Sequence, residues 1–273
     1  LLPTDESRRR AYVVARGQLH PVPRGFVLMA PRKLGPMLRS PVLSVAGKLR
    51  VLWEPLVPRR REVDDESVAD FATRRLGMEV FQRLVQPLLA GIYSGDPDRL
   101  SMAATMPQFL DDEKQYGSLL RAARRYEDQA ASGARYGMFV APQAGMESMI
   151  KAIAARLPAG TIELETPVCE LRREDDGWRI RFEAGRAERT FDGVVLATPA
   201  HTAAKIVKST SDALARELAQ IEHATTVVVS VAAERRQIAH PLDGFGVVVP
   251  RCELRPIIAV SFASQKYPER APA

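Results

Sequence analysis

Residues that commonly act as nucleophiles, general bases or metal ligands are few in this chain. Its 273 residues include two cysteines, Cys169 and Cys252, and four histidines, and their spacing matches neither a metal site nor a disulfide framework. The sequence contains no G-x-S-x-G nucleophile elbow and no phosphate-binding P-loop. Because no side chain stands out as a catalytic acid, base or nucleophile, we assign no catalytic residue and no metal ligand. We expect a bound cofactor to carry out any chemistry.

One stretch imitates a dinucleotide-binding fingerprint. Gly244-Phe245-Gly246 begins like G-x-G-x-x-G, but Val249 occupies the place of the third glycine, and the residues that follow predict a strand. The fingerprint needs a strand before it and a helix after it, because the diphosphate lies at the N-terminus of that helix. We therefore exclude this stretch as a nucleotide-binding turn.

Two glycines interrupt the apolar stretch LLAGIYSGDPDRLSM, residues 88–102. Gly95 precedes Asp96-Pro97, a combination typical of a turn. Gly91 stands where leucine or alanine would simply have continued a helix. Two interpretations of Gly91 remain open: a helix cap with a left-handed backbone, or a backbone position that a ligand approaches closely.

The composition is that of a globular protein with a basic surplus. Hydrophobic residues make up 46% and charged residues 26% of the chain, and the net charge is +6. A basic surplus suits nucleic acid, an anionic membrane surface or an acidic ligand. Aromatic residues are only 6% and do not alternate with the basic ones, so we do not expect nucleic acid as a partner.

The first half of the chain predicts a short hairpin followed by helices. Residues 10–23 predict the hairpin, which turns at Arg16-Gly17. Ser67, at the end of an acidic stretch, predicts the start of a helix, and Gly77 predicts its end. Further helices are expected at 78–89, 102–110 and 116–131.

The segment 25–61 is both apolar and basic, and its prolines break it into short helical pieces. Apolar side chains, among them Leu49, Leu52 and Trp53, are interspersed with lysines and arginines. Such a segment suits a surface that lies on anionic lipid; an amphipathic cover over the protein's own core is the alternative. No run of about 18 apolar residues occurs, so no helix is predicted to span a bilayer.

Strands dominate from residue 139 onward. Apolar spacing predicts helices at 146–157 and 200–207. Strands are expected at 161–165, 168–173, 178–183, 189–196, 225–232, 246–249 and 257–262. Asp175-Asp176-Gly177 predicts a tight turn, and the uniformly apolar run at 194–197 predicts a strand that is covered on both faces. The fold class is therefore mixed, with α+β and α/β parts and helices in front.

Several segments together resemble the oxygen-dependent, FAD-containing protoporphyrinogen oxidases of the flavin amine oxidase-like superfamily. They are RGQLHPVPRGF (16–26), DDESVADFATRRLG (64–77), QPLLAGIYSGDPDRLSM (86–102), TPVCEL (166–171), FDGVVLATPA (191–200) and PLDGFGVVVPR (241–251). Compared with that family, the sequence lacks the N-terminal G-x-G-x-x-G and the C-terminal FAD segment. The resemblance therefore implies an internal part of such an enzyme, which we expect to be inactive and to hold FAD weakly on its own.

The resemblance also implies the central part of a FAD-binding, Rossmann-like flavoprotein. Residues 1–138 would form the substrate side and a helical, membrane-associating region. Residues 139–208 would form part of the FAD-binding domain, and 209–273 the start of an antiparallel substrate-binding sheet. The implied reaction is FAD-dependent oxidation of protoporphyrinogen IX to protoporphyrin IX with O2 as acceptor. Coproporphyrinogen III is an alternative substrate, and a non-catalytic porphyrin- or lipid-binding protein is an alternative function.

The same family suggests where the protein works. We expect a cytoplasmic protein, peripheral to the inner face of the cell membrane, with a second copy of the chain as a further candidate partner. More positive charge around the open end of the pocket would favour coproporphyrinogen III, because this substrate carries four carboxylates.

The resemblance assigns site residues by position. The substrate-binding candidates are Arg10, Gly91, Phe245, Val248 and Ile258. Arg10 would pair with a propionate, Gly91 would leave room for the macrocycle, and the other three would form apolar walls. The cofactor-binding candidates are Val168, Ala197 and Pro199.

Overall fold

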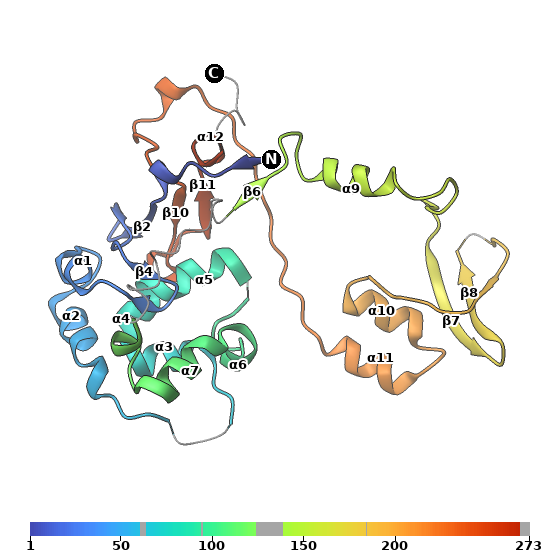
Figure 1. Ribbon diagram of the computed structural model, residues 1–273, viewed down its shortest axis with the longest axis horizontal. Coiled ribbons are helices and arrows are strands. Elements are labelled where there is room, and N and C mark those ends of the chain that lie inside the picture. Colours follow the sequence, from blue (N-terminus) through green and yellow to red (C-terminus); the bar gives the residue numbers. More distant parts are fainter. Residues whose placement is uncertain (61–63, 94, 124–138, 184, 268–273) are drawn as a thin grey trace. The chain divides into compact units, whose positions relative to one another are not determined.

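The computed structural model describes residues 1–60, 64–93, 95–123, 139–183 and 185–267, and the chain forms two compact units (Figure 1). Unit 1 comprises Leu1–Met146 and Thr226–Ala273, and unit 2 comprises Glu147–Thr225. The mixed α and β class is confirmed. The three functional regions expected from the sequence remain a prediction, because a division into compact units does not assign their roles.

The main sheet of unit 1 joins the two ends of the chain. Its strands are β11 (Ala259–Ser261), β10 (Gly246–Val248), β2 (Ala11–Ala15) and β3 (Gln18–Pro21), in that order. β10 and β2 are parallel, and the other neighbours are antiparallel. Arg16 and Gly17 have φ of 53° and 76°, the left-handed values of a two-residue I′ turn, and they confirm the predicted hairpin. Two short pairs complete the strands of unit 1: β1 (Leu2–Pro3) with β6 (Val140–Ala141), and β4 (Phe26–Val27) with β5 (Ala30–Pro31).

Helices form the rest of unit 1. They are α1 (Leu34–Arg39), α2 (Val45–Leu52), α3 (Val68–Leu76), α4 (Met78–Val80), α5 (Gln86–Tyr93), α6 (Met102–Thr105), α7 (Pro107–Tyr116) and the C-terminal α12 (Ala263–Lys266). The predicted start and end of α3 are confirmed: the Ser67 side chain accepts from the Asp70 N–H, and Gly77 follows with φ of 93°. The helix predicted at 102–110 is two helices, because Pro107 begins the second one. Gly117, at φ of 72°, ends α7, and a helical stretch resumes at 119–123; the rest of the helix predicted at 116–131 lies outside the described residues.

The helix predicted at 78–89 contains an irregularity. Between α4 and α5 the segment η3 (Phe81–Val85) has π-helical geometry, and α5 continues to Tyr93. Pro87 offers a reason, because it has no N–H and its ring crowds the carbonyl four positions earlier, that of Arg83. Such π segments often accompany functional sites.

A buried ion pair links the helices of unit 1. Arg75 and Glu54 are fully buried and in contact. Arg75 also donates to the carbonyls of Val57 and Gly117, both at 3.0 Å. The Glu54 carboxylate accepts from the Leu119 N–H at 2.9 Å, so it satisfies the start of the helical stretch at 119–123. These contacts connect three segments that are far apart in sequence.

A second arginine extends this network. Arg74 lies 2.6 Å from Glu113 and 2.7 Å from Glu66. Burial lowers the pKa of Arg74, but its two carboxylate partners outweigh that effect and raise it above its ordinary value. Glu113 has a lowered pKa although burial acts against it, because Arg74 donates to its carboxylate.

The described residues of unit 2 form a three-stranded antiparallel sheet and three helices. The strands are β7 (Val168–Glu174), β8 (Gly177–Phe182) and β9 (Arg189–Phe191), and the helices are α9 (Glu147–Ala154), α10 (Ala200–Val207) and α11 (Asp212–Ala219). Glu174 pairs with Gly177 across the predicted turn at Asp175-Asp176, which is confirmed. α10 packs against β7, and Ser209, just after α10, donates from its hydroxyl to the Leu171 carbonyl at 3.1 Å.

Two predicted strands are wrong, and the strand predicted at 189–196 forms only at Arg189–Phe191 (β9). Residues 161–165, 194–197 and 225–232 are not in strands, and Val195 and Val228 are 92% and 90% exposed. No strand among the described residues pairs with these segments. Without a neighbour, a strand cannot satisfy its backbone hydrogen bonds or cover its side chains.

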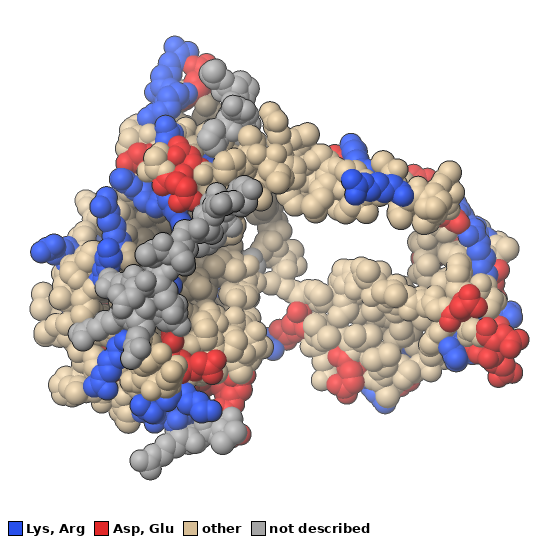
Figure 2. Space-filling model, viewed as in Figure 1, with Lys and Arg blue, Asp and Glu red and all other residues tan. Residues whose placement is uncertain are grey.

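Charge is dispersed on the face that Figure 2 shows. Lysine and arginine side chains lie among uncharged surface, with acidic side chains between them. None of the helices in the described part of the chain is long and apolar enough to cross a membrane.

Candidate functional site

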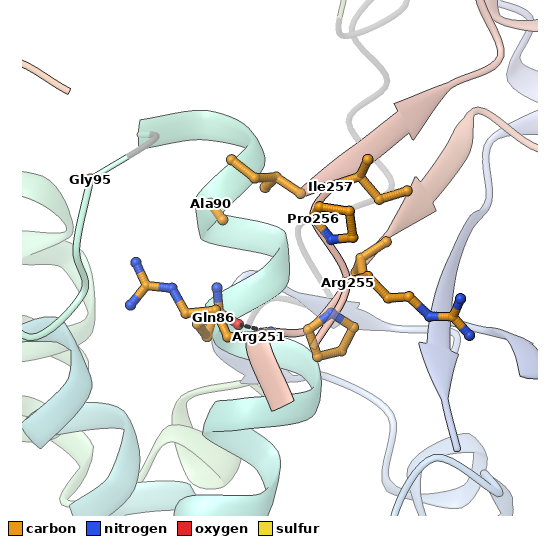
Figure 3. A pocket seen from close by; sticks show the side chains of 10 residues that line it. Gln86, Ala90, Gly95, Arg251, Arg255, Pro256 and Ile257 are labelled. Carbon is orange, nitrogen blue, oxygen red and sulfur yellow. Dashed lines mark hydrogen bonds between the residues drawn. The ribbon is translucent and has the colours of Figure 1, made fainter. Parts of the chain in front are cut away.

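A pocket in unit 1 lies between α5 and the connection from β10 to β11 (Figure 3). Its lining residues are Gln86, Ala90, Gly95, Val249, Pro250, Arg251, Arg255, Pro256, Ile257 and Ile258, and its volume is about 130 Å³. Most of these side chains are apolar, with a few polar groups at defined positions, as is typical of small-molecule sites. The volume suits part of a large flat ligand rather than all of it.

Hydrogen bonds fix the β10–β11 connection to the helix. The Gln86 side chain accepts from the Arg251 N–H at 3.0 Å, and the Arg251 guanidinium lies 2.9 Å from Asp96. The same contact lowers the pKa of Asp96. Gln86 and Arg251 are 165 positions apart in the sequence, so the pocket exists only once unit 1 has folded.

Glu253 anchors the same connection to the hairpin. Its carboxylate accepts from the N–H groups of Arg16 and Gly17 at 2.8 and 3.0 Å and pairs with Arg83 of the π segment at 3.2 Å. Burial raises the pKa of Glu253, but these donors outweigh it and leave the pKa below its ordinary value. Ionised Glu253 therefore holds the turn, the hairpin and the helix together.

The sheet brings four predicted substrate residues together. The Phe245 N–H donates to the Arg10 carbonyl at 2.7 Å. Val248, at the end of β10, lies opposite Val13 of β2. The Val249 N–H donates to the Ile258 carbonyl at 2.8 Å. Ile258 lines the pocket, whereas Val248 packs partly against the hydrophobic core of unit 1.

Arg10 already has a carboxylate partner. Its guanidinium lies 3.0 Å from Asp243, with both side chains about 45% exposed. Asp243 also accepts the Tyr12 hydroxyl at 2.5 Å, and this hydrogen bond, followed by the charge of Arg10, lowers the pKa of Asp243. Arg10 is thus held in position at the N-terminal end of β10. Its pairing with a propionate remains a prediction.

The interpretation of Gly91 as a helix cap is wrong. Gly91 lies inside α5, which continues to Tyr93, and it is absent from the glycines with positive φ. A Cβ placed on Gly91 would meet no atom within 4 Å, so packing within the described residues does not require a glycine here. Its neighbour Ala90 lines the pocket. Gly95 also lines the pocket, where an added Cβ would lie 3.1 Å from Leu100.

The predicted flavin contacts lie in unit 2. Val168 begins β7, an edge strand of the described sheet, and Ala197 is exposed. Pro199 precedes α10 and gives it no side-chain cap, so the first N–H groups of this helix have no cap from Pro199. An edge strand and a helix N-terminus offer backbone groups of the kind that bind dinucleotide cofactors. The contact of these residues with FAD remains a prediction.

Several pocket residues were missed in the sequence. Gln86, Ala90, Arg251, Pro256 and Ile257 carry no local motif that indicates a ligand. One feature of the sequence could have indicated these residues. Two prolines, Pro250 and Pro256, enclose an arginine-containing turn directly after an apolar strand. Within the described ranges, no group of three or more His, Cys, Asp and Glu side chains is arranged to hold a metal ion.

The sequence pattern of one enzyme family covers almost the whole chain. The flavin containing amine oxidoreductase family matches residues 2–273, and the chain belongs to this family. Its members are flavoproteins, so the expected cofactor class is confirmed. The family is also consistent with the absence of an obvious acid, base or nucleophile in the sequence, because a flavin supplies the redox chemistry.

The individual relatives are porphyrinogen oxidases. The chain is 28% identical to a coproporphyrinogen III oxidase of Bacillus subtilis (strain 168), over 96% of this chain and 56% of the relative. It is also 28% identical to a mitochondrial protoporphyrinogen oxidase of Nicotiana tabacum, over 91% and 56%. A crystal structure assigned as a protoporphyrinogen oxidase, from Exiguobacterium sp. 255-15, superimposes with a TM-score of 0.78 at 26% identity, over 99% of this chain and 57% of that one. The chain thus spans slightly more than half the length of these relatives.

Proposed function

We propose that this chain takes part in the FAD-dependent oxidation of protoporphyrinogen IX to protoporphyrin IX, with O2 as the acceptor. The observation that carries the proposal is the apolar pocket between α5 and the β10–β11 connection, whose lining includes Ile258 and Ala90, the residue before Gly91. A large flat tetrapyrrole needs apolar walls and a few groups that bind its carboxylates.

The chain's own residues bind and orient the substrate in this proposal. A bound flavin would supply the hydride acceptor. Val249, Ile258 and Ala90 form apolar walls that exclude water. Phe245, whose ring lies beside Lys266 and does not line the pocket, would extend this wall along the strand. Arg10, held by Asp243, directs its remaining N–H donors at a propionate. Val168, Ala197 and Pro199 would contact the cofactor through the backbone.

Oxidation of coproporphyrinogen III is the second candidate. The relatives in Bacillus subtilis and Staphylococcus aureus are both coproporphyrinogen III oxidases, the latter 29% identical over 96% of this chain. Both candidates share the macrocycle and differ in the number of carboxylates. A non-catalytic porphyrin-binding protein would bind both porphyrins without flavin chemistry.

We expect the chain to bind protoporphyrin IX and coproporphyrin III. Phe245→Ala should weaken both by about tenfold or more, because an aromatic wall contributes about 1.5–3 kcal/mol when covered. Porphyrin fluorescence titration measures the Kd. Phe191→Ala, at an exposed phenylalanine in β9 of unit 2, is the matched control and should change neither Kd.

Catalysis needs a separate experiment. The chain replaces the matched segment of the Bacillus subtilis relative, and the chimera is assayed for porphyrin formation from porphyrinogen in air. Turnover above the spontaneous rate supports an oxidase. A folded chimera that retains flavin and binds porphyrin without turnover would instead support the non-catalytic alternative.

We further propose that unit 1 contacts an anionic membrane surface through 25–61. Exposed apolar side chains follow α2 at helical spacing, and Leu49 and Trp53 are each 61% exposed. The stripe consists of Val45, Leu49, Leu52, Trp53 and Leu56, with Lys48 beside it. An apolar stripe next to basic groups is the pattern of a helix that lies in the headgroup region.

Replacing Leu52 and Trp53 by serine should reduce binding to vesicles that contain phosphatidylglycerol by several-fold, because the lipid-facing apolar area is lost. Salt should weaken the wild-type interaction as well, since charges are screened beyond about 10 Å at 0.1 M. Vesicle co-sedimentation measures both effects. Leu214→Ser, at an exposed leucine of α11, is the control; binding that ignores lipid charge and these substitutions would count against the membrane face.

A further inference from the structure

The pocket carries two guanidinium groups that the sequence did not assign. Arg251 belongs to the short 3-10 helix η5 (Arg251–Glu253), and Arg255 follows Leu254, which has a left-handed φ of 52°. This turn places both arginines in the pocket lining, and Figure 3 shows them extending to opposite sides. The apolar pocket therefore has a guanidinium group on each side.

The two arginines differ in their partners. The charge of Arg251 is balanced by Asp96 at 2.9 Å, and its backbone N–H donates to the Gln86 side chain. Arg251 therefore fixes the β10–β11 connection to α5. Among the described residues, no carboxylate pairs with Arg255. An exposed guanidinium without a carboxylate beside an apolar pocket is available to a ligand, and its planar fork matches a carboxylate.

Arg255 also lies at the other end of β10 from Arg10. Arg10 pairs with Asp243, before the strand begins, whereas Val249 and Pro250, after the strand ends, line the pocket with Arg255. Asp243 and Val249 are six positions apart, a span of at most about 20 Å. Between these two ends the strand presents Phe245 and Val249 on one face, whereas Val248 lies on the other face, against the core of unit 1.

This arrangement distinguishes the two candidate substrates. The propionates of protoporphyrinogen IX lie on two adjacent pyrrole rings, and therefore on one edge of the macrocycle. Coproporphyrinogen III carries a propionate on each of its four rings, so it presents carboxylates at opposite edges. Only the second substrate can place a carboxylate at Arg10 and another at Arg255.

We propose that Arg255 is a specificity-determining residue, which binds a propionate on the edge opposite to Arg10 and favours a four-carboxylate tetrapyrrole. The inference rests on the proposed binding of a porphyrinogen by the pocket, and it favours the second candidate substrate, coproporphyrinogen III, over the first. Arg255 contacts the substrate periphery and takes no part in the redox step.

The test compares coproporphyrin III and protoporphyrin IX as fluorescent probes with the wild-type chain and three variants. Arg255→Gln should weaken coproporphyrin III binding about tenfold, the value of one charge-assisted hydrogen-bonded pair, and protoporphyrin IX binding less than about twofold. Arg255→Lys keeps the charge without the fork, so its Kd for coproporphyrin III should lie between those of wild type and Arg255→Gln. Arg236→Gln, at an exposed arginine that does not line the pocket, should change neither Kd.

Circular dichroism of each variant confirms that it is folded, which the exposed position of Arg255 favours. Equal weakening of both porphyrins by Arg255→Gln, or no weakening of either, overturns the inference while leaving porphyrin binding intact. A wild-type chain that binds neither porphyrin overturns both the inference and the function on which it rests.

Discussion

Gly91→Leu should weaken porphyrin binding by at least about tenfold and leave unit 1 folded. The substituted side chain meets no protein atom near its Cβ, so the fold tolerates it. A tetrapyrrole lying against α5 would have to move away from the added atoms, and overpacking of this kind costs about 1–3 kcal/mol. The loss should grow with the size of the side chain, from alanine to leucine.

Gly91→Ala should make unit 1 more stable, although it should weaken porphyrin binding. Because Gly91 has a helical backbone, Gly91→Ala should raise the free energy of unfolding by roughly 0.5–1 kcal/mol, since glycine is a poor residue inside a helix. Fluorescence titrations and thermal melts of the same variants separate the two effects. If Gly91→Ala raises the melting temperature but weakens porphyrin binding, then Gly91 serves ligand binding and not folding.

Gly35 provides a matched control. It lies in α1, and an added Cβ there also meets nothing within 4 Å. Gly35→Leu should therefore leave porphyrin affinity unchanged. A folded Gly91→Leu variant that binds porphyrin as tightly as the wild type would show that Gly91 does not contact the porphyrin.

Arg75→Met should lower the free energy of unfolding of unit 1 by about 3–5 kcal/mol, because it leaves Glu54 buried without its partner. Glu54 and Arg75 are both fully buried. A charged group in the protein interior is strongly destabilising unless an opposite charge pairs with it. Urea unfolding followed by circular dichroism measures the change. The double variant Arg75→Met with Glu54→Leu should recover much of the loss, because it removes both charges from the interior.

An exposed ion pair supplies the comparison. Lys151 and Glu147 lie 3.1 Å apart with side chains 72% and 75% exposed, and Lys151→Met should have little effect, as is usual for surface pairs. If Arg75→Met costs no more than Lys151→Met, the buried pair does not stabilise the helices as we infer.

Local structure could be predicted wherever a few neighbouring residues decide it. The Arg16-Gly17 turn, the Ser67 cap, the end of α3 at Gly77 and the turn before β8 were all predicted correctly. Each depends on backbone preferences or a capping hydrogen bond within about four residues. The resemblance identified the family, because its segments occur in the expected order along the chain.

Predictions failed where distant residues decide the outcome. The apolar run at 194–197 has the composition of a covered strand, yet pairing needs a neighbour that composition does not specify. Gly91 follows an apolar run, as a cap does, but α5 continues past it to Tyr93. The π segment before α5 was also missed, although Pro87 was visible in the sequence.

The sequence by itself determined the hairpin, the helix ends, the mixed fold class and the family, because periodicity, caps and turns act over short distances. Only the tertiary structure decided the site. It joined Gln86 to Arg251 across 165 positions, placed Arg10 and Arg255 at opposite ends of β10, and buried Arg75 against Glu54. The physical reason is that burial and the convergence of side chains depend on which segments pack together, and the local pattern of residues does not encode that choice.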